Sequence, residues 1–295
     1  MSKKPLTISQ FFKQFPDDET CLKHLFETRF GQGFECPKCE RPSNWYRIKA
    51  ERAYSCQWCG HHLHVTVGTP FEKTRTPLQL WFYAMFLFTT TRHGVSAKEL
   101  QRQLGVTYKT AWRMGHEIRK HMAAVDGDKP IGGEGKTVQI DETMVGGVMH
   151  VGYRGRHIGN KTFVLGMVEN GGDVVTKIIP DVKRATLFPL IEANVAPGTT
   201  IHTDTLGSYR GLSLKGYRHQ TVNHTAKEYV SAYGATTNSI ESFWAILQRG
   251  IAGTHIYVSG KHLSKYTGEF EYRFNRRERA ETMIGELLST FRPLS

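Results

Sequence analysis

The spacing of apolar residues predicts helices in the first half of the chain and a mixture of strands and helices in the second half. The most apolar stretch, residues 78–88, is well short of the roughly 20 residues that a membrane span needs, so we interpret it as a buried helix. Near the other end, apolar side chains fall at helical spacing on one face. They are Ile240, Phe243, Trp244, Leu247 and Ile251.

Short β-branched runs predict the strands of the second half. They cover residues 138–145, 162–169 and 174–180, and a further run ends at Asp204. The glycine-containing stretch 169–173 predicts a hairpin turn, and the pattern over 185–195 predicts a helix. Three strands, a helix and another strand favour an α/β fold, with a mixed sheet flanked by helices.

Two adjacent helices are predicted between residues 96 and 121, joined at 104–107. Such a pair forms a helix-turn-helix, which places its second helix in the major groove of DNA. The exposed face of that helix is expected to carry Lys109, Arg113, His116, Arg119 and Lys120, with Ala111, Trp112 and Ile118 facing inward. An ordinary helical hairpin with solvated charges is the competing interpretation.

The charge balance favours an anionic partner. Lys and Arg number 39 against 27 Asp and Glu, which gives a net charge of +12, and no single tail carries the excess. A nucleic acid is the expected partner, although a soluble protein with a basic surface has the same composition. The first residues lead into no apolar core of a secretion signal, which favours a cytoplasmic protein.

Four of the five cysteines form two Cys-x-x-Cys pairs, namely Cys36, Cys39, Cys56 and Cys59. Two such pairs at this separation offer four thiolates to one tetrahedral Zn²⁺. Because four cysteines fill the coordination shell, we expect the zinc to be structural. Cys21 has no partner in this pattern and is interpreted as a small buried apolar residue.

Three acidic residues stand where predicted elements end or begin. Asp141 and Asp204 each terminate an apolar strand, and Glu241 opens the helix that starts near Asn238. Together they would bind a pair of divalent ions that align the oxygens of a phosphodiester. Each has a simpler interpretation: an aspartate at a strand end forms turns, and Asn238 with Glu241 matches a capping box.

These patterns divide the chain into four parts. We predict N-terminal helices and a zinc ribbon over residues 1–70, a helical region with the helix-turn-helix over 71–125, and a linker rich in glycine and charge over 126–137. Residues 138–295 then form the catalytic domain, with a basic C-terminal helix.

The order of these motifs resembles bacterial insertion-sequence transposases with an N-terminal zinc ribbon and a DDE catalytic domain. The resemblance rests on the cysteine pairs, on residues 105–112, on Asp141-Glu142-Thr143 with Val145-Gly146-Gly147, on residues 238–244 and on Phe274-Asn275-Arg276-Arg277. It covers about residues 10 to 280.

The resemblance implies a ribonuclease H-like fold, with Asp141, Asp204 and Glu241 as ligands of Mg²⁺ or Mn²⁺. It implies cleavage at the ends of an insertion sequence and strand transfer into target DNA, by a homodimer or larger assembly associated with the bacterial nucleoid. Relatives tend to have Lys or Arg seven residues after the glutamate, whereas this chain has Gln248, beside Arg249 as a candidate DNA contact. A non-catalytic DNA-binding protein and a nuclease that cleaves without joining are the alternatives.

Overall fold

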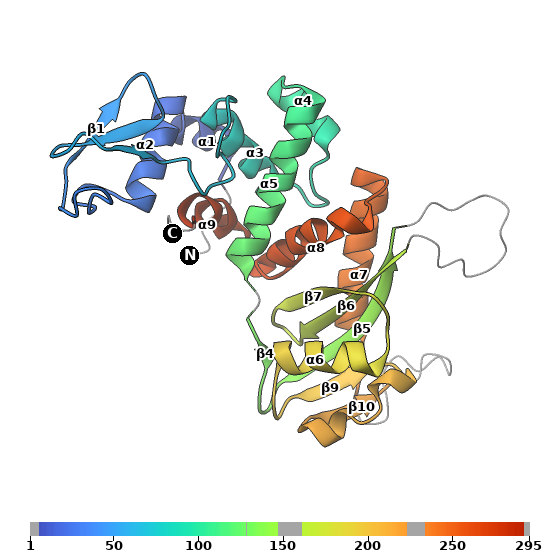
Figure 1. Cartoon of the computed structure of the whole chain (residues 1–295). Helices are drawn as coiled ribbons and strands as arrows, with labels where there is room; N and C mark the ends of the chain where they lie inside the picture. Colours follow the sequence, from blue (N-terminus) through green and yellow to red (C-terminus); the bar gives the residue numbers. More distant parts are fainter. Residues whose placement is uncertain (1–5, 128, 147–160, 223–233, 292–295) are drawn as a thin grey trace. The chain divides into compact units, whose positions relative to one another are not determined.

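The computed structural model describes residues 6–127, 129–146, 161–222 and 234–291 (Figure 1). Gly147 of the family motif and Asp128 of the expected linker lie outside this range. Contacts divide the chain into two units. Unit 1 comprises Met1–Thr91, Ala97–His121 and Arg279–Ser295, and unit 2 comprises Arg92–Ser96 and Met122–Glu278.

Unit 1 is mainly helical and contains a small sheet. Its helices are α1 (Ile8–Gln14), α2 (Asp18–Arg29), α3 (Leu78–Thr90), α4 (Ala97–Leu104), the part of α5 (Tyr108–Asp126) up to His121, and α9 (Met283–Ser289). The strands β1 (Trp45–Ile48), β2 (Ala53–Cys56) and β3 (His62–His64) form an antiparallel sheet.

The apolar helix predicted at residues 78–88 is α3, and it is buried as expected. Trp81, Phe82 and Phe88 on it are at most 1% exposed. A helix that is apolar on all sides must be covered on all sides, and both α2 and α9 contact α3. The contacts thus place α9 in unit 1, whereas the sequence-based boundary places it with residues 138–295.

The turn between α4 and α5 follows from its sequence. Gly105 adopts a left-handed conformation (φ 65°) immediately after α4, and its N–H donates to the carbonyl of Gln101 at 3.1 Å, which is a common way to end a helix. The hydroxyl of Thr107 then accepts from the N–H of Thr110 and begins α5. The two helices and the tight turn are therefore present where the sequence predicts them.

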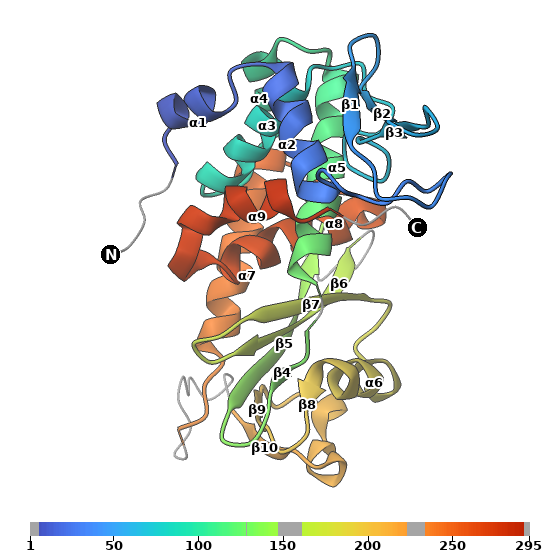
Figure 2. The ribbon, with the colours of Figure 1, turned by 90° about the vertical axis from the view of Figure 1, so that its left-hand side faces the viewer.

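Unit 2 is built on a mixed sheet of β5 (Thr137–Val145), β6 (Thr162–Glu169), β7 (Val174–Ile179), β9 (Thr200–Thr203) and β10 (Arg218–Thr221). The strand order is β10-β9-β5-β6-β7 (Figure 1). Strands β9 and β10 lie at the lower end of this sheet in Figure 2. Strands β5, β6 and β7 pair with one another in antiparallel fashion, whereas β9 runs parallel to β5 and β10 runs parallel to β9. A minor parallel pair joins β4 (Ile131–Gly132) and β8 (Val195–Ala196).

Helices cover both faces of this sheet. On one face α6 (Arg184–Asn194) and the short helices η1 (Gly207–Tyr209) and η2 (Leu212–Lys215) enclose a core with Ile140 and Leu165. On the other face α7 (Asn238–Gly250), the π-helical turn η4 (Ile251–His255) and α8 (Gly260–Phe274) pack on Val145 and Val164. Because side chains alternate along a strand, neighbouring residues of β5 face different helices.

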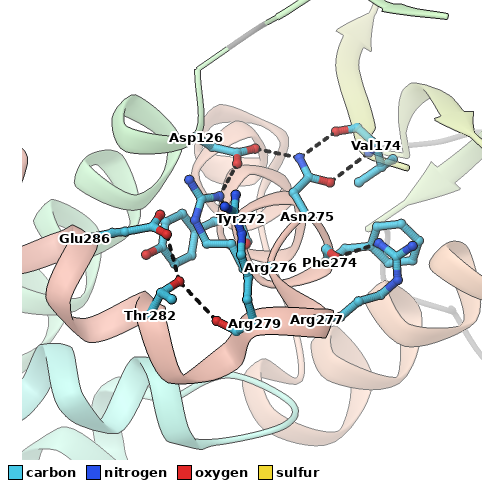
Figure 3. A network of polar contacts seen from close by, with 10 residues as sticks. All are labelled: Asp126, Val174, Tyr272, Phe274, Asn275, Arg276, Arg277, Arg279, Thr282 and Glu286. Atoms are coloured by element: carbon cyan, nitrogen blue, oxygen red, sulfur yellow. Dashed lines mark hydrogen bonds and ion pairs between the residues drawn. The ribbon is translucent and has the colours of Figure 1, made fainter. Parts of the chain in front are cut away.

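Helix α8 satisfies the open edge of the sheet at β7. Asn275, just after α8, accepts from the N–H of Val174 at 2.7 Å and donates to its carbonyl at 3.0 Å, as a paired strand would (Figure 3). One turn earlier, Glu271 accepts from the N–H of Thr176 at 2.5 Å. Glu271 and Asn275 are four residues apart on the helix, and their partners Thr176 and Val174 are two residues apart on β7. The helix therefore prevents another strand from pairing with the edge of the sheet at β7.

Arg276 has a structural role in the same network. The guanidinium of Arg276 forms an ion pair with Asp126 and lies 3.9 Å from the ring centroid of Tyr272. Asp126 also accepts a hydrogen bond from the amide of Asn275 at 2.9 Å. Arg276 is 6% exposed. Asn275 and Arg276 of the family motif therefore hold unit 2 together.

Among the described helices, none combines the length and apolar character required to cross a membrane.

Candidate functional site

The four cysteines of the two Cys-x-x-Cys pairs converge as predicted. Their sulfur atoms all lie within 4.8 Å of one another, with Cys36 and Cys59 at 3.7 Å and Cys39 and Cys56 at 3.9 Å. Zn–S bonds of about 2.3 Å in a tetrahedron require sulfur atoms about 3.8 Å apart. The geometry therefore fits a closed zinc site.

Matching backbone turns build the two halves of this site. In each pair, the residue after the second cysteine has a left-handed conformation: Glu40 (φ 54°) and Gly60 (φ 65°). Their N–H groups donate to the carbonyls of Cys36 and Cys56 at 2.8 and 3.1 Å. The hydroxyl of Ser43 donates to the sulfur of Cys56 at 3.2 Å, which stabilises negative charge on that ligand.

The sheet of unit 2 brings Asp141 and Asp204 to neighbouring strands. In the parallel pair of β5 and β9, Gln139 is the partner of His202. Continued by two residues, this register would place Asp141 opposite Asp204, the residue directly after β9. Asp141 lies in the middle of β5, whereas the sequence predicted it at the end of a strand. One carboxylate oxygen of Asp204 accepts from the N–H of Leu206 at 2.9 Å, so the turn role considered for Asp204 is also present.

Trp244 on α7 contacts Asp141 directly. Its indole N–H donates to Oδ2 of Asp141 at 3.1 Å. The partner of Asp141 across the sheet is Gly166, and a Cβ placed on Gly166 would lie 2.5 Å from the Trp244 ring. The absence of a side chain at Gly166 therefore makes room for the indole that orients Asp141.

Glu142 points to the opposite face of the sheet and is a further acidic group of the site. Its Oε2 accepts from the hydroxyl of the fully buried Tyr209 at 2.5 Å. Burial first, and then the negative charges of Glu142 and Asp204, raise the pKa of Asp141 to about 7. Burial likewise raises the pKa of Glu142, with a further contribution from Asp204. The negative charges of Glu142 and Asp204 thus disfavour ionisation of Asp141, although Glu142 lies on the other face of the sheet.

Gln139 fixes the start of α7 against β5. Its Oε1 accepts from the N–H groups of Ser239 and Ile240 at 2.8 and 3.2 Å, and its own amide donates to Asn170 at 2.7 Å. These N–H groups belong to the first turn of α7, where a capping acceptor is needed. A side chain two residues before Asp141 therefore positions the helix that carries Glu241.

The capping box considered for Asn238 and Glu241 is not the arrangement observed. The residue that precedes α7 is Thr237, and Asn238 is already the first residue of the helix. Glu241 instead accepts from the hydroxyl of Thr237 at 2.7 Å and is exposed. Gln139 supplies the capping acceptor through tertiary structure, so Glu241 is not required for this purpose.

Asp141, Asp204 and Glu241 do not meet at one point. Among the described residues, the four cysteines are the single group of three or more acidic, histidine or cysteine side chains whose ligand atoms lie within 4.8 Å of one another. Binding of two ions about 3.5–4 Å apart would not require the three carboxylates to meet at one point.

The side chain of Gln248 is held by the sheet. Its amide donates to the hydroxyl of Thr143 on β5 at 3.0 Å, two residues beyond Asp141. Arg249 is exposed on α7. Gln248 is thus hydrogen-bonded to the strand of Asp141, and Arg249 is the cation beside it.

Helix α5 exposes some but not all of its predicted cations. Lys109 and Arg113 are exposed, and Lys120 is exposed beside Glu117 at 2.8 Å. Arg119 is 2% exposed, with its guanidinium 5.0 Å from the Phe88 ring centroid, and His116 is 3% exposed. The prediction of an exposed face was therefore wrong for these two residues. Trp112, expected inward, is 40% exposed.

The sequence comparisons match both units of this description. Residues 132–275 match the family described as the ISXO2-like transposase domain, and residues 16–62 match the transposase zinc-ribbon domain. The second match contains all four cysteines of the cluster. The cluster is accordingly a structural zinc site of a zinc ribbon.

Two relatives align with this chain over most of their own length. A protein of the transposable element ISH50 from Halobacterium salinarum is 25% identical over 284 residues, which are 88% of this chain and 92% of the relative. A transposase-like protein from Haemophilus influenzae is 31% identical over 105 residues, which are 36% of this chain and 83% of the relative. A crystal structure of a pre-cleavage Mos1 transpososome is similar over 72% of this chain and 80% of that chain, at 11% identity and a TM-score of 0.28.

Proposed function

The chain belongs to the family of insertion-sequence transposases with an ISXO2-like domain and a zinc ribbon, and from this premise we propose that unit 2 catalyses metal-dependent DNA cleavage and strand transfer. The catalytic residues of the proposal are Asp141, Asp204 and Glu241. The observation that supports it is the parallel pairing of β5, which contains Asp141, with β9, which Asp204 directly follows, while Gln139 fixes the helix of Glu241.

The fold supports this assignment. A ribonuclease H-like domain is expected to have three antiparallel strands followed by two strands that run parallel to the first, and the sheet of unit 2 has this arrangement. Such a domain is also expected to carry an acidic residue on, or directly after, each of the two central parallel strands. We propose that fold for unit 2. The helices on both faces complete the three-layer α/β architecture.

The carboxylates suit hard divalent cations. Oxygen ligands of this kind select Mg²⁺ or Mn²⁺, and burial of Asp141 beside Glu142 and Asp204 leaves negative charge that a cation would balance. Two bound ions would align water or a DNA 3′-hydroxyl with the phosphodiester and stabilise the leaving oxygen. The indole of Trp244 fixes the orientation of Asp141, and the hydroxyl of Tyr209 fixes the position of Glu142.

The cations of unit 1 and α7 support a DNA partner. We propose that Lys109, Arg113 and Lys120 of α5 contact the phosphates of the transposon end, with α4 and α5 acting as a helix-turn-helix. Arg249 contributes a contact near the catalytic carboxylates. Because two ends must be joined to one target, the active form is a homodimer or a larger assembly.

A cleavage and strand-transfer assay tests the proposal. Full-length protein with Mg²⁺ should nick a duplex that carries the insertion-sequence end and join its 3′-hydroxyl to a second duplex. Asp141→Asn should abolish both steps while the DNA affinity changes by less than about threefold, because the phosphate contacts are elsewhere. Nicking without joining would assign a nuclease, and DNA binding without either step would assign a non-catalytic protein.

A further inference from the structure

Unit 1 contains a cavity of about 470 Å³ between α5 and the loop of residues 73–76. It lies beside the start of α5, and none of the four cysteines lines it. Its lining includes Lys109 and Arg113, which the proposed function assigns to DNA phosphates. Its walls combine two chemical characters. Aromatic and apolar side chains form one part, and cationic side chains form the other.

The apolar part is built around two tryptophans. Trp81 is 1% exposed, and its indole N–H donates to the hydroxyl of Thr74 at 2.9 Å, which holds the ring against the loop. Trp112 stacks on His116 with 3.8 Å between ring centroids and is still 40% exposed. Exposed indole surface in a concave site favours a flat aromatic ligand.

The cationic part consists of Lys73, Arg75, Lys109 and Arg113, and no acidic residue lines the cavity. Within the part of the chain that the structure describes, no carboxylate pairs with Arg75, Lys109 or Arg113. Lys73 is 87% exposed and has a left-handed backbone (φ 56°), which is unfavourable for a residue with a side chain. This concentration of positive charge favours an anionic ligand.

The loop that carries these groups is fixed before any ligand binds. The guanidinium of Arg52 donates to the carbonyls of Thr74 and Thr76, each at 3.1 Å, and forms an ion pair with Asp18 at 3.0 Å. Arg113 donates to the carbonyl of Glu72 at 2.6 Å, which joins α5 to the loop. A pre-formed site loses less conformational entropy when it binds.

We propose that this cavity binds one unpaired nucleotide of DNA, with the base against Trp112 and the phosphate among the cations. The inference rests on the proposed DNA-binding function and adds a ligand preference to it. A base that is paired within a duplex is stacked on both sides and cannot enter a concave site, whereas an unpaired base presents its flat face. The cationic rim alone would bind phosphates of either form.

The test compares two DNA hairpins that differ in one nucleotide. One hairpin has a blunt end, and the other carries a single unpaired 3′-thymidylate; each is titrated into full-length protein by fluorescence anisotropy at constant salt. We expect the unpaired nucleotide to increase affinity by roughly five- to tenfold, the range of one base stacked on an aromatic side chain. Trp112→Ala should remove this gain and leave the affinity for the blunt hairpin unchanged within about twofold.

Further variants separate the two halves of the cavity. Arg75→Ala should reduce the gain from the unpaired nucleotide, whereas Lys13→Ala, which removes an exposed cation of unit 1 outside the cavity, should keep it. Circular dichroism of each variant reports its folding. Equal affinities of the natural protein for the two hairpins, or a gain that survives Trp112→Ala, would overturn the inference but not the proposed function. If neither hairpin binds, the DNA-binding function itself fails.

Discussion

The indole N–H of Trp244 donates a hydrogen bond to the carboxylate of Asp141 at 3.1 Å, from α7 to β5. The same ring occupies the space above Gly166, the partner of Asp141 in the sheet. A residue that the helical pattern identifies as core is thus also a contact of the proposed metal ligand. This contact links the packing of α7 to the chemistry of the site.

Gly166→Ala should therefore damage the site through packing. The added Cβ would lie 2.5 Å from the Trp244 ring, so the indole must move and its bond to Asp141 must lengthen. We expect a loss of stability of about 1–3 kcal/mol, as for other overpacked cores, together with reduced cleavage. Gly253→Ala is the matched control, because a Cβ at Gly253 meets no atom within 4 Å. Thermal unfolding of both variants measures the difference, and equal effects would contradict the packing argument.

Trp244→Phe separates the hydrogen bond from the packing. The phenyl ring retains most of the apolar contact but has no N–H to donate to Asp141. Because that bond lowers the pKa of Asp141, its loss should raise this pKa further and weaken Mg²⁺ binding by roughly five- to tenfold, as expected for about 1 kcal/mol. Isothermal titration with Mg²⁺ gives the affinity. An unchanged affinity would mean that the indole serves packing alone.

The pKa of Asp141 predicts how stability varies with pH without metal. Its folded value of about 7 lies above the unfolded value of about 3.9, so between these values the folded state binds more protons than the unfolded state. Stability should therefore fall as pH rises through this window. Asp141→Asn should raise the melting temperature at pH 8 by at least about 2 °C in EDTA, and less at pH 5.

Asp181 serves as the control, because the fold lowers the pKa of Asp181 whereas it raises the pKa of Asp141. Asp181 accepts from the hydroxyl of Thr186 at 2.6 Å, and this bond, with that of Lys183 N–H, lowers its pKa. Asp181→Asn should therefore lower the melting temperature at pH 8. The account of Asp141 would be wrong if Asp141→Asn also destabilised the metal-free protein at that pH.

Metal removal tests the zinc site. The purified protein should contain one zinc per chain, and Cys39→Ser should lose the metal and unfold the ribbon, because binding of structural zinc and folding are coupled. Cys21→Ala is the control: Cys21 is fully buried, and burial raises its pKa to about 12, so it is an inert core residue. Zinc analysis by mass spectrometry decides the matter. Full zinc content in Cys39→Ser would exclude that residue as a ligand.

The features predicted correctly are those that local pattern determines. The cysteine spacing gives the metal cluster, the apolar run gives α3, and the residues around 104–107 give the turn before α5. In each case the residues that interact are close in sequence or share an unambiguous chemistry. The β-branched runs likewise gave β5, β6, β7 and β9.

The errors arise where tertiary contacts override local preference. Strand β10 was not predicted, because Arg218–Thr221 contains no apolar residue and becomes a strand only by pairing with β9. Arg119 is buried because the Phe88 ring offers a partner from another helix. Gln139 caps α7 from about a hundred residues away, so the local motif of Asn238 and Glu241 was misleading.

The central claim is that Asp141, Asp204 and Glu241 bind divalent ions that drive DNA cleavage, and Glu241→Gln tests it most directly. Full-length natural and variant proteins are titrated with Mn²⁺ by isothermal calorimetry, with circular dichroism to verify the fold. Glutamine retains hydrogen bonding to Thr237 but removes the charge. We predict that one of two Mn²⁺ binding events disappears and that cleavage is lost with it. Unchanged Mn²⁺ binding and cleavage in the folded variant would contradict the account.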